Sequence, residues 1–434
     1  MDQRITLDEF KKWVNGDAVA IRGRAVLEPA GGPSDKIFPP SHSIADNDKR
    51  PGAKYAFEER RVGEKSVSCV LIDSVQSQAN RMEAALEALW SAGKLTLPVL
   101  QVDLSGTADD IGKVTSLSAP HRVADAILRD SVIQEDARDI LFRMSVVGKS
   151  FTDSSPRNAG PLFKVCPTAL VFGMWDSTGP RGGLGSKFAR VLTSEIIGFD
   201  AKSGVKTASR IDPTGITTNS AKIYVSANPE TAGSPWTHDW QEAKLDDSKK
   251  PLSEDNALKW GKKDKAGKPS AINHSNVPPT IEEVAGGVTI GRAEQTVVLS
   301  LAGIRRLAFA EGAEEARAVL AALALVAILA EQENGHDLRS RCLLVPHWNE
   351  DESKRGALQL EFVKRDGSTA NLVIDRDCAI TLYEQAVAAL PEKLKFESKL
   401  KGKPLAELKP SPKLKYLITR SRALAEAGID VADD

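Results

Sequence analysis

The longest uninterrupted apolar run of the sequence constrains its fold more than any other feature. It extends from Ala318 to Ala330, thirteen residues between Arg317 and Glu331, and alanine and leucine dominate it. A helix that crosses a membrane needs about 20 such residues. The run therefore predicts a buried helix over Glu314 to Gln332, in the core of a cytoplasmic protein without a membrane partner. The first residues, MDQRITLDEFKKW, contain no apolar segment, so we expect no secretory signal.

Length and composition narrow the class of protein. A chain of 434 residues is long enough for two or three domains, or for one core with large insertions. Apolar residues make up 41% and charged residues 27%, which excludes a disordered chain, a collagen and a disulfide scaffold. The formal net charge is −1, so a nucleic-acid site would have to concentrate positive charge locally.

The four cysteines give no sign of a metal centre. Cys69, Cys166, Cys342 and Cys378 lie far apart, without the close paired spacing that zinc ligands need. Cys69 and Cys342 stand inside apolar runs and are expected to be buried thiols. We therefore expect no metal and no cofactor.

Alternating and helical patterns follow one another along the chain, which predicts an α+β fold with interleaved strands and helices. Strands are expected at Ala18 to Val26, Ser66 to Ile72, Ala169 to Phe172, Val297 to Leu301, Cys342 to Val345, Leu358 to Val363 and Ala370 to Ile374. The last two flank the turn Asp366-Gly367 and predict a hairpin. Helices are expected at Gln78 to Trp90, Asp125 to Asp139, Ser186 to Ile196, Glu314 to Gln332 and Asp377 to Leu390.

Four segments are interpreted as insertions or extensions of one core that spans residues 1–434. They are an N-terminal loop insertion at about 28–65, a helical insertion at about 100–165, a thumb-like mobile insertion at about 205–285 and a basic C-terminal segment at 393–434. Within the third, Ile216 to Val225 is expected to form an extended arm. The stretch from Asn228 to Pro279 shows almost no periodicity and is expected not to pack in a core.

The first candidate site is the strand-to-helix junction Ser74 to Leu86, SVQSQANRMEAAL. A helix N-terminus presents free N–H groups that suit a phosphate, and amide side chains beside an arginine can hold a sugar-phosphate backbone without reading bases. The alternative is that Ser77 or Gln78 only caps the helix. The candidate RNA-binding residues here are Ser74, Gln76, Ser77, Gln78, Asn80 and Arg81.

The second candidate site is the glycine-rich basic segment Phe172 to Gly198. No acidic residue occurs from Ser177 to Ser194, and glycine beside cationic side chains favours close approach to phosphate. The spacing fits neither a Walker A loop nor a dinucleotide fingerprint. A flexible surface loop, or the phosphate loop of a metabolic enzyme, remains possible. The candidate RNA-binding residues are Arg181, Lys187 and Arg190, with Arg210 close by.

A third basic region, Lys393 to Arg422, is interpreted either as an electrostatic arm for nucleic acid or as the solvated face of a C-terminal helix. The six histidines are scattered, and no catalytic motif stands out. We therefore expect no catalytic residue.

Several of these strings resemble a known family. CVLIDSVQSQANRMEAAL, Cys69 to Leu86, is similar to the ES-x-QS-x-ANR-x-E signature of the backbone protein of type I-U, now I-G, CRISPR interference complexes. The segment Pro167 to Ala201 resembles its G-x-WDS and R-x-x-SEI-x-G-x-D elements. Further similar strings are HRVADAILRDS (His121 to Ser131), SRIDP (Ser209 to Pro213), GGVTI with VVLSLAGIRRLAF (Gly286 to Phe309) and SRCLLVP (Ser340 to Pro346).

The resemblance implies a RAMP-superfamily protein with an RRM-like, ferredoxin-like palm and thumb-like or finger-like insertions. It implies a non-enzymatic Cascade subunit that assembles in several copies along one crRNA and leaves the guide free to pair with target DNA. Copies of itself and other subunits of the ribonucleoprotein complex would be its partners. This role fits a chain with few aromatic residues. Base pairing by the guide reads the target sequence, so the protein needs only to hold the sugar-phosphate backbone of the RNA.

An enzymatic alternative also follows from the resemblance. Related backbone subunits in other CRISPR types cleave target RNA with a loop aspartate and a metal ion. Asp35, Asp46 and Asp48 would be the candidates in this sequence.

Overall fold

The computed structural model describes residues 5–42, 54–179, 186–246, 253–261, 265–283, 285–349, 351 and 356–426. The chain divides into two compact units. The first unit comprises Met1–Gly204 and Gly287–Leu414, and the second comprises Val205–Gly286 and Lys415–Asp434. The second unit leaves the first between β11 (Lys202–Ser203) and β16 (Val288–Thr289), which pair with each other. Asp46, Asp48 and Arg181 lie outside the described residues.

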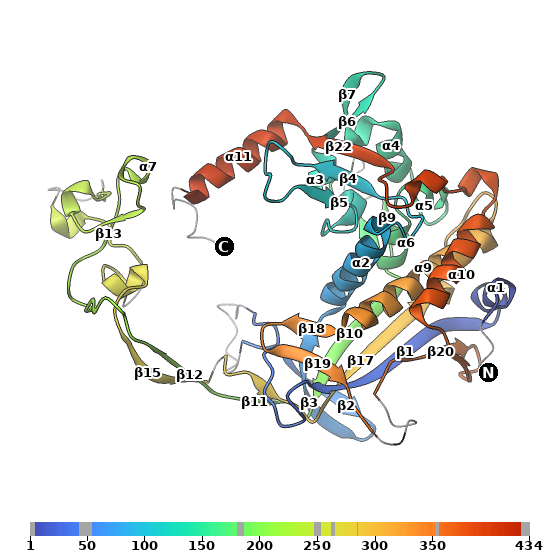
Figure 1. Ribbon diagram of the computed structural model, residues 1–434, viewed down its shortest axis with the longest axis horizontal. Helices are drawn as coiled ribbons and strands as arrows, with labels where there is room; N and C mark the ends of the chain where they lie inside the picture. Colours follow the sequence, from blue (N-terminus) through green and yellow to red (C-terminus); the bar gives the residue numbers. More distant parts are fainter. Residues whose placement is uncertain are drawn as a thin grey trace. The chain divides into compact units, whose positions relative to one another are not determined.

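A large antiparallel sheet forms the centre of the first unit (Figure 1). Its main path runs β18-β19-β1-β17-β10-β3-β2, and β20 and β21 extend it beside β1. The strands are β1 (Ala18–Pro29), β2 (Phe57–Val62), β3 (Lys65–Asp73), β10 (Leu192–Phe199), β17 (Arg292–Ser300), β18 (His336–Arg339), β19 (Cys342–Pro346), β20 (Gln359–Lys364) and β21 (Thr369–Leu372). The sheet confirms the predicted α+β class, and the predicted strands on β1, β3, β17, β19 and the β20–β21 hairpin are confirmed.

One long helix lies at the centre of the helices that pack beside the sheet. The predicted apolar helix is α9 (Ala313–Asn334), and it packs against α1 (Leu7–Asn15), α2 (Val75–Ser91), α6 (Pro167–Phe172) and α10 (Arg376–Ala388). Its residues from Ala318 to Ile328 are all buried. The alanines let neighbouring helices approach closely, so a helix that is apolar on every side becomes the core of the layer. The predicted helices on α2, α9 and α10 are confirmed.

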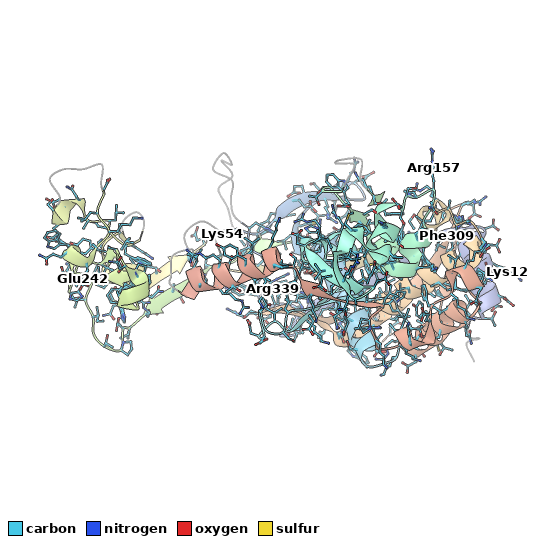
Figure 2. All side chains as sticks on the ribbon, turned by 90° about the horizontal axis from the view of Figure 1, so that it is seen from above. Lys12, Lys54, Arg157, Glu242, Phe309 and Arg339 are labelled. Atoms are coloured by element: carbon cyan, nitrogen blue, oxygen red, sulfur yellow. The ribbon has the colours of Figure 1, made fainter. Side chains whose placement is uncertain are left out.

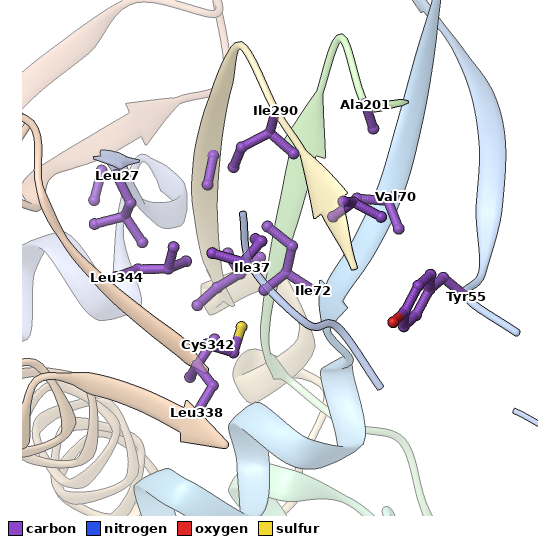
Figure 3. Packing of buried hydrophobic residues seen from close by; sticks show 14 residues of the cluster. Leu27, Ile37, Tyr55, Val70, Ile72, Ala201, Ile290, Leu338, Cys342 and Leu344 are labelled. Atoms are coloured by element: carbon purple, nitrogen blue, oxygen red, sulfur yellow. The ribbon is translucent and has the colours of Figure 1, made fainter. Parts of the chain in front are cut away.

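A hydrophobic cluster fills the end of the sheet where β1, β3 and β19 meet loop residues (Figure 3). Leu27, Ile72 and Leu344 point into it from three strands, and Ile37 closes it from the loop after β1. Cys342 belongs to this cluster, and Cys69 is buried on the opposite face of the sheet. Both thiols therefore have the predicted structural role. Burial raises the pKa of the Cys342 thiol to about 11.

A second, five-stranded sheet overturns one helix prediction. It has the order β5-β4-β22-β6-β7, with β4 (Leu100–Asp103), β5 (Lys113–Thr115), β6 (Ser131–Glu135), β7 (Arg138–Leu141) and β22 (Ala406–Pro410). The segment Asp125 to Asp139 was expected to be one helix, but only α3 (Ala126–Arg129) is helical. Asp136 and Ala137 both have positive φ, which forms a tight turn between β6 and β7. The remaining helices of this region are α4 (Val146–Thr152) and α5 (Gly160–Val165).

Two further predictions in the second candidate segment are wrong. The expected strand Ala169 to Phe172 is part of helix α6, where Pro167 occupies the first turn. Every residue of α6 is buried, so no helical periodicity is visible. The expected helix Ser186 to Ile196 is instead β9 (Lys187–Phe188) followed by β10. Strand β10 lies between β17 and β3, where branched side chains suit a buried sheet position.

The second unit contains a small core of its own and a two-stranded ribbon. The ribbon pairs β12 (Lys206–Arg210) with β15 (Val277–Glu282). The expected arm Ile216 to Val225 is extended only at β13 (Tyr224–Val225), which pairs with β14 (Trp236–Thr237). The stretch after Asn228 was expected not to pack, yet Tyr224, Ala243 and Ala257 form a buried cluster. Helix α7 (Pro229–Ala232) follows β13. Helix α11 (Pro412–Glu426) contains the sequence boundary between the two units, which lies between Leu414 and Lys415.

Among the described helices, none is both long and apolar enough to span a membrane. Within the same residues, no group of three or more histidine, cysteine or acidic side chains is arranged to hold a metal ion.

Candidate nucleic-acid interface

The first candidate segment begins helix α2 with a serine cap. Ser74 has extended backbone angles, and its hydroxyl accepts a hydrogen bond from the backbone N–H of Ser77 at 3.2 Å. This geometry satisfies one of the free N–H groups at the helix start. The predicted capping alternative is thus realised, with Ser74 rather than Ser77 or Gln78 as the capping residue.

Two of the predicted contact residues, Gln78 and Arg81, are bound to a buried carboxylate. Asp73 is fully buried at the end of β3. Its Oδ2 accepts from Gln78 Nε2 at 2.8 Å and from Arg81 Nε at 3.0 Å, and its Oδ1 accepts from Arg339 Nη2 at 3.0 Å. Arg339 is labelled in Figure 2. Buried charges are stable only when they are paired in this way. This network fastens α2 to the sheet.

The amide of Gln78 also connects α2 to the two central strands. Its Oε1 accepts from Ser194 Oγ of β10 at 2.8 Å and from Gln295 Nε2 of β17 at 2.9 Å. Gln78 is 0% exposed, so both ends of its amide are used inside the fold. The side chains of Gln76 and Asn80, by contrast, are exposed and lie one turn apart on α2. They are the members of this segment that are open to a ligand.

The second candidate segment borders a hollow in the first unit with a volume of about 260 Å³. We call it the Trp175 hollow. It is lined by His121, Arg122, Phe172, Gly173, Met174, Trp175, Lys187, Phe188 and Arg190. The lining combines cationic and aromatic side chains and includes no carboxylate. A negatively charged ligand with flat rings suits such a surface.

A short strand pair presents the aromatic and cationic groups together. Strand β8 (Met174–Trp175) pairs with β9 so that Trp175 lies opposite Lys187 and Met174 lies opposite Phe188. Alternation along each strand buries Met174 and Phe188 and exposes the other two side chains. Lys187 Nζ lies 5.2 Å from the centre of the Trp175 ring, and Trp175 is 54% exposed. An indole face beside an ammonium group offers both stacking and phosphate binding.

Arg122 forms the buried side of the hollow. It donates from Nε and Nη2 to the two carboxylate oxygens of Glu83, at 2.7 and 2.6 Å, and from Nη1 to the carbonyl oxygen of Gly173 at 3.1 Å. Its φ is +55°, a conformation that few residues other than glycine adopt. Burial raises the pKa of the Glu83 carboxyl to about 7, and Arg122 opposes that rise.

Arg190 brings a further positive charge to the same place. Its Nε donates to the carbonyl oxygen of Phe172 at 3.0 Å, and its two terminal amino groups have no hydrogen-bond partner in the described part of the chain. Burial and the nearby charge of Arg122 lower the pKa of Arg190. An anion bound in the hollow would relieve this repulsion, because opposite charge favours the protonated guanidinium.

The ends of the glycine-rich loop are firmly held next to the hollow. Asp176 is buried and pairs with Arg143, and its backbone N–H donates to the carbonyl oxygen of Ser186 at 2.9 Å. The hydroxyl of Ser186 donates to the carbonyl oxygen of Ser154 at 2.6 Å. The residues on either side of the undescribed stretch are therefore anchored.

The remaining predicted residues lie elsewhere. Arg210 belongs to the second unit, where its Nη2 donates to the carbonyl oxygen of Ser275 at 2.7 Å. Asp35, the described member of the proposed nuclease aspartates, is exposed and accepts from the backbone N–H of Lys36 at 2.8 Å. Such a bond is typical of a loop aspartate in a turn.

Three cations on the open face of the central sheet are already paired with carboxylates. Arg22 pairs with Glu361, and Arg60 pairs with Glu195 at 2.8 Å. Arg292 pairs with Glu294 at 2.6 Å. A phosphate chain would have to displace these carboxylates, so this face is less suited to RNA than the Trp175 hollow.

Sequence reasoning missed His121, Arg122 and Trp175 as members of the site. Trp175 had a visible signal, because it is an isolated aromatic residue directly before the glycine-rich basic loop. No local pattern marked Arg122 as a site residue, because its partner Glu83 is 39 residues away in the sequence.

Comparison with known proteins agrees with these elements. Residues 21–203 match the family described as CRISPR-associated protein GSU0053. The matched range includes β1 from Ile21 onward, helix α2 with its Ser74 cap, and all residues that line the Trp175 hollow. No curated protein matches the chain. Over residues 21–203 the chain is therefore similar to the CRISPR-associated protein GSU0053 family.

Proposed function

We propose that this protein is the crRNA-binding backbone subunit of a type I-G (I-U) CRISPR interference complex. In this proposal several copies bind one guide RNA side by side and hold it so that its bases pair with target DNA. The protein acts as a scaffold within the ribonucleoprotein and not as an enzyme. Its partners are the crRNA, further copies of itself and the other subunits of the complex.

The observation that carries the proposal is the composition of the Trp175 hollow. Trp175 supplies an exposed ring, and Lys187 and Arg190 supply positive charge without a carboxylate in the lining, whereas the charge of Arg122 is paired with Glu83. Stacking is tolerant of base identity, and phosphate contacts carry no sequence information. A site with these two elements binds single-stranded RNA of any sequence, which is what a guide-holding subunit requires.

The α2 segment extends the proposed contact surface. Gln76 and Asn80 expose amide groups on the first turns of the helix, where backbone N–H groups have no partner within the helix. Amides and backbone N–H groups hold phosphate and ribose oxygens. The thumb-like role of the second unit also belongs to this proposal, with the β12–β15 ribbon as its extended element.

The test is expression of the full chain together with its CRISPR locus, followed by analysis of the RNA that copurifies. The expected result is RNA of uniform length from the wild type, and a strong loss of that RNA from Trp175→Ala and Lys187→Ala. Trp348→Ala and Lys12→Ala are the matched controls, because Trp348 is 65% exposed and Lys12 (labelled in Figure 2) is exposed on α1.

Three outcomes would contradict the proposal in different ways. If the wild type carries no RNA of uniform length, the protein is not a guide-binding subunit. If RNA copurifies equally with both hollow variants and both controls, the protein binds RNA through another surface. Periodic cleavage of complementary RNA in the presence of Mg²⁺, abolished by Asp35→Ala, would show that the protein is an enzyme.

A further inference from the structure

A second cavity, separate from the Trp175 hollow, lies in the second unit. It has a volume of about 590 Å³, within the range of small-molecule sites. Its lining includes Lys222, Tyr224, His238, Trp240, Glu254 and Lys268. All of these residues fall within Val205–Gly286, so the cavity is built by this unit alone.

Backbone pairing holds the walls of the cavity in place. Tyr224 forms a bridge with Lys259, and the backbone N–H of Ile223 donates to the carbonyl oxygen of Gly267 at 3.1 Å. The wall that carries Trp240 is fixed by a turn in which Asp239 Oδ1 accepts from the backbone N–H of Gln241 at 2.9 Å. The cavity is therefore a formed site on a folded unit.

A charged hydrogen-bond acceptor is fixed in one wall. Glu254 Oε1 accepts from Lys222 Nζ at 2.6 Å and from Tyr224 Oη at 2.7 Å. Those two bonds lower the pKa of Glu254, so the carboxylate is ionised at neutral pH. Its second oxygen, Oε2, has no hydrogen-bond partner among the described residues. Oε2 is thus available to accept from an amino group of a ligand.

The other walls supply a flat ring and a cation. Trp240 is half-buried, because it packs against the cluster of Tyr224, Ala243 and Ala257 while it also lines the cavity. Lys268 is exposed, and its ammonium group has no partner in the described part of the chain. With Lys222 and Lys268 against Glu254, the charged side chains of the lining carry one net positive charge.

We propose that this cavity binds one unstacked nucleotide of a single-stranded nucleic acid. The base stacks on Trp240, its exocyclic amino group donates to Glu254 Oε2, and its phosphate contacts Lys268. The site consequently favours adenine, cytosine and guanine over uracil and thymine, because the latter two bases lack an exocyclic amino group. This inference deepens the proposed function and rests on it, since it assigns the second unit a direct contact with the strand.

The affinity test uses the full-length protein and twelve-nucleotide probes of oligoadenylate and oligouridylate, as RNA and as DNA, followed by fluorescence anisotropy. Trp240→Ala is expected to weaken oligoadenylate binding by roughly 5- to 150-fold, the range for one stacked base, and Trp240→Phe is expected to restore most of the affinity. Trp236→Ala is the control, because Trp236 lies in the same unit without lining the cavity. The RNA and DNA probes distinguish a guide nucleotide from a nucleotide of the target.

A second variant tests the proposed hydrogen bond and guards against misfolding. Glu254→Gln is expected to bring the ratio of oligoadenylate affinity to oligouridylate affinity close to one. Lys268→Ala is expected to weaken the binding of both probes. Lys244→Ala alters an exposed lysine outside the cavity and is expected to weaken the binding of neither.

The inference is overturned if oligoadenylate and oligouridylate bind equally to the wild type, or if Trp240→Ala and Trp236→Ala have equal effects. Both results remain distinguishable from failure of the proposed function. If the proposed function itself fails, Trp175→Ala leaves RNA binding intact, or the wild-type protein binds no RNA at all.

Discussion

Arg122 and Glu83 form a two-pronged ion pair in which the side chains are only 8% and 2% exposed. The pair joins α2 to the segment before α3, and the third arm of the guanidinium reaches the carbonyl oxygen of Gly173. Gly173 and Arg122 both line the Trp175 hollow. The ion pair thus fixes the buried wall of the proposed RNA site.

Breaking this pair from one side is expected to be costly. Glu83→Gln leaves Arg122 buried without a countercharge, and at pH 8, about one unit above the raised pKa of Glu83, loss of the ionised carboxylate is expected to lower the free energy of unfolding by about 1–2 kcal/mol. The measurement is urea unfolding at pH 8, where the carboxyl is ionised. The double variant Glu83→Leu with Arg122→Met is the control, because replacing both partners by apolar residues is often close to neutral. A single variant as stable as the wild type would show that the pair has no structural role.

The same pair predicts a pH dependence of stability. Burial raises the pKa of Glu83 from its ordinary value of 4.5 to about 7 in the folded state. The folded protein therefore binds a proton that the unfolded chain releases, and the stabilisation from this proton is lost as the pH rises through about 7. The difference in free energy of unfolding between wild type and the double variant is expected to fall from pH 5 to pH 7.5. A difference that stays constant or rises would show that the pKa is not raised.

Gly173 is expected to tolerate no side chain. Its φ is +81°, and a Cβ there would lie 2.8 Å from the backbone nitrogen of Arg190. Gly173→Ala should destabilise the fold by about 1–3 kcal/mol and weaken RNA binding, because Arg190 must move. Gly93→Ala is the matched control: its φ is +68°, but no atom lies within 4 Å of the added carbon. Equal losses for both variants in thermal unfolding would mean that backbone strain alone is responsible.

The long elements were predictable from the sequence because each has a clear pattern of its own. Strand β1 alternates between a buried and an open face, α9 is apolar over thirteen residues, and the turn at Gly367 has the positive φ that its sequence predicts. Helix α6 was not predictable, because all six of its residues are buried and so short an apolar run fits a strand as well as a helix. Strand β10 was not predictable either, because its last four residues are all buried and hide the alternation of its first four. Only the tertiary contacts of β10 with β17 and β3 determine its state.

The residues of the candidate site could also be predicted only in part, because tertiary contacts determine which of them are exposed. Lys187 and Arg190 were identified because a basic, glycine-rich stretch without acidic residues is unusual in any context. The roles of Gln78 and Gln76 could not be separated, because the sequence places two similar amides two residues apart on one helix. Contacts from β10 and β17 bury one of them, and these strands are more than 100 residues away.

That difference gives a direct test of the two amides. Gln78→Leu leaves Asp73, Ser194 and Gln295 with fewer hydrogen bonds, so it should lower the free energy of unfolding by about 1–3 kcal/mol. Gln76→Ala should leave stability unchanged within about 0.5 kcal/mol, as for most surface changes, and weaken RNA binding. Chemical unfolding and RNA-binding titrations measure both quantities. If Gln76→Ala destabilises the fold as much as Gln78→Leu, the burial pattern of α2 is wrong.

The charge of Lys187 should be visible in the salt dependence of RNA binding. The ammonium group lies over Trp175 and has no carboxylate partner among the described residues, so we expect it to neutralise one phosphate. For single strands, each neutralised phosphate contributes about 0.7 to the slope of log K against log salt concentration. Lys187→Ala should therefore reduce the magnitude of this slope by about 0.7. Lys12→Ala, which changes an exposed lysine on α1, should leave the slope unaltered. Titrations between 50 and 300 mM salt measure the difference, and an unchanged slope for Lys187→Ala would place the phosphate contact on other residues.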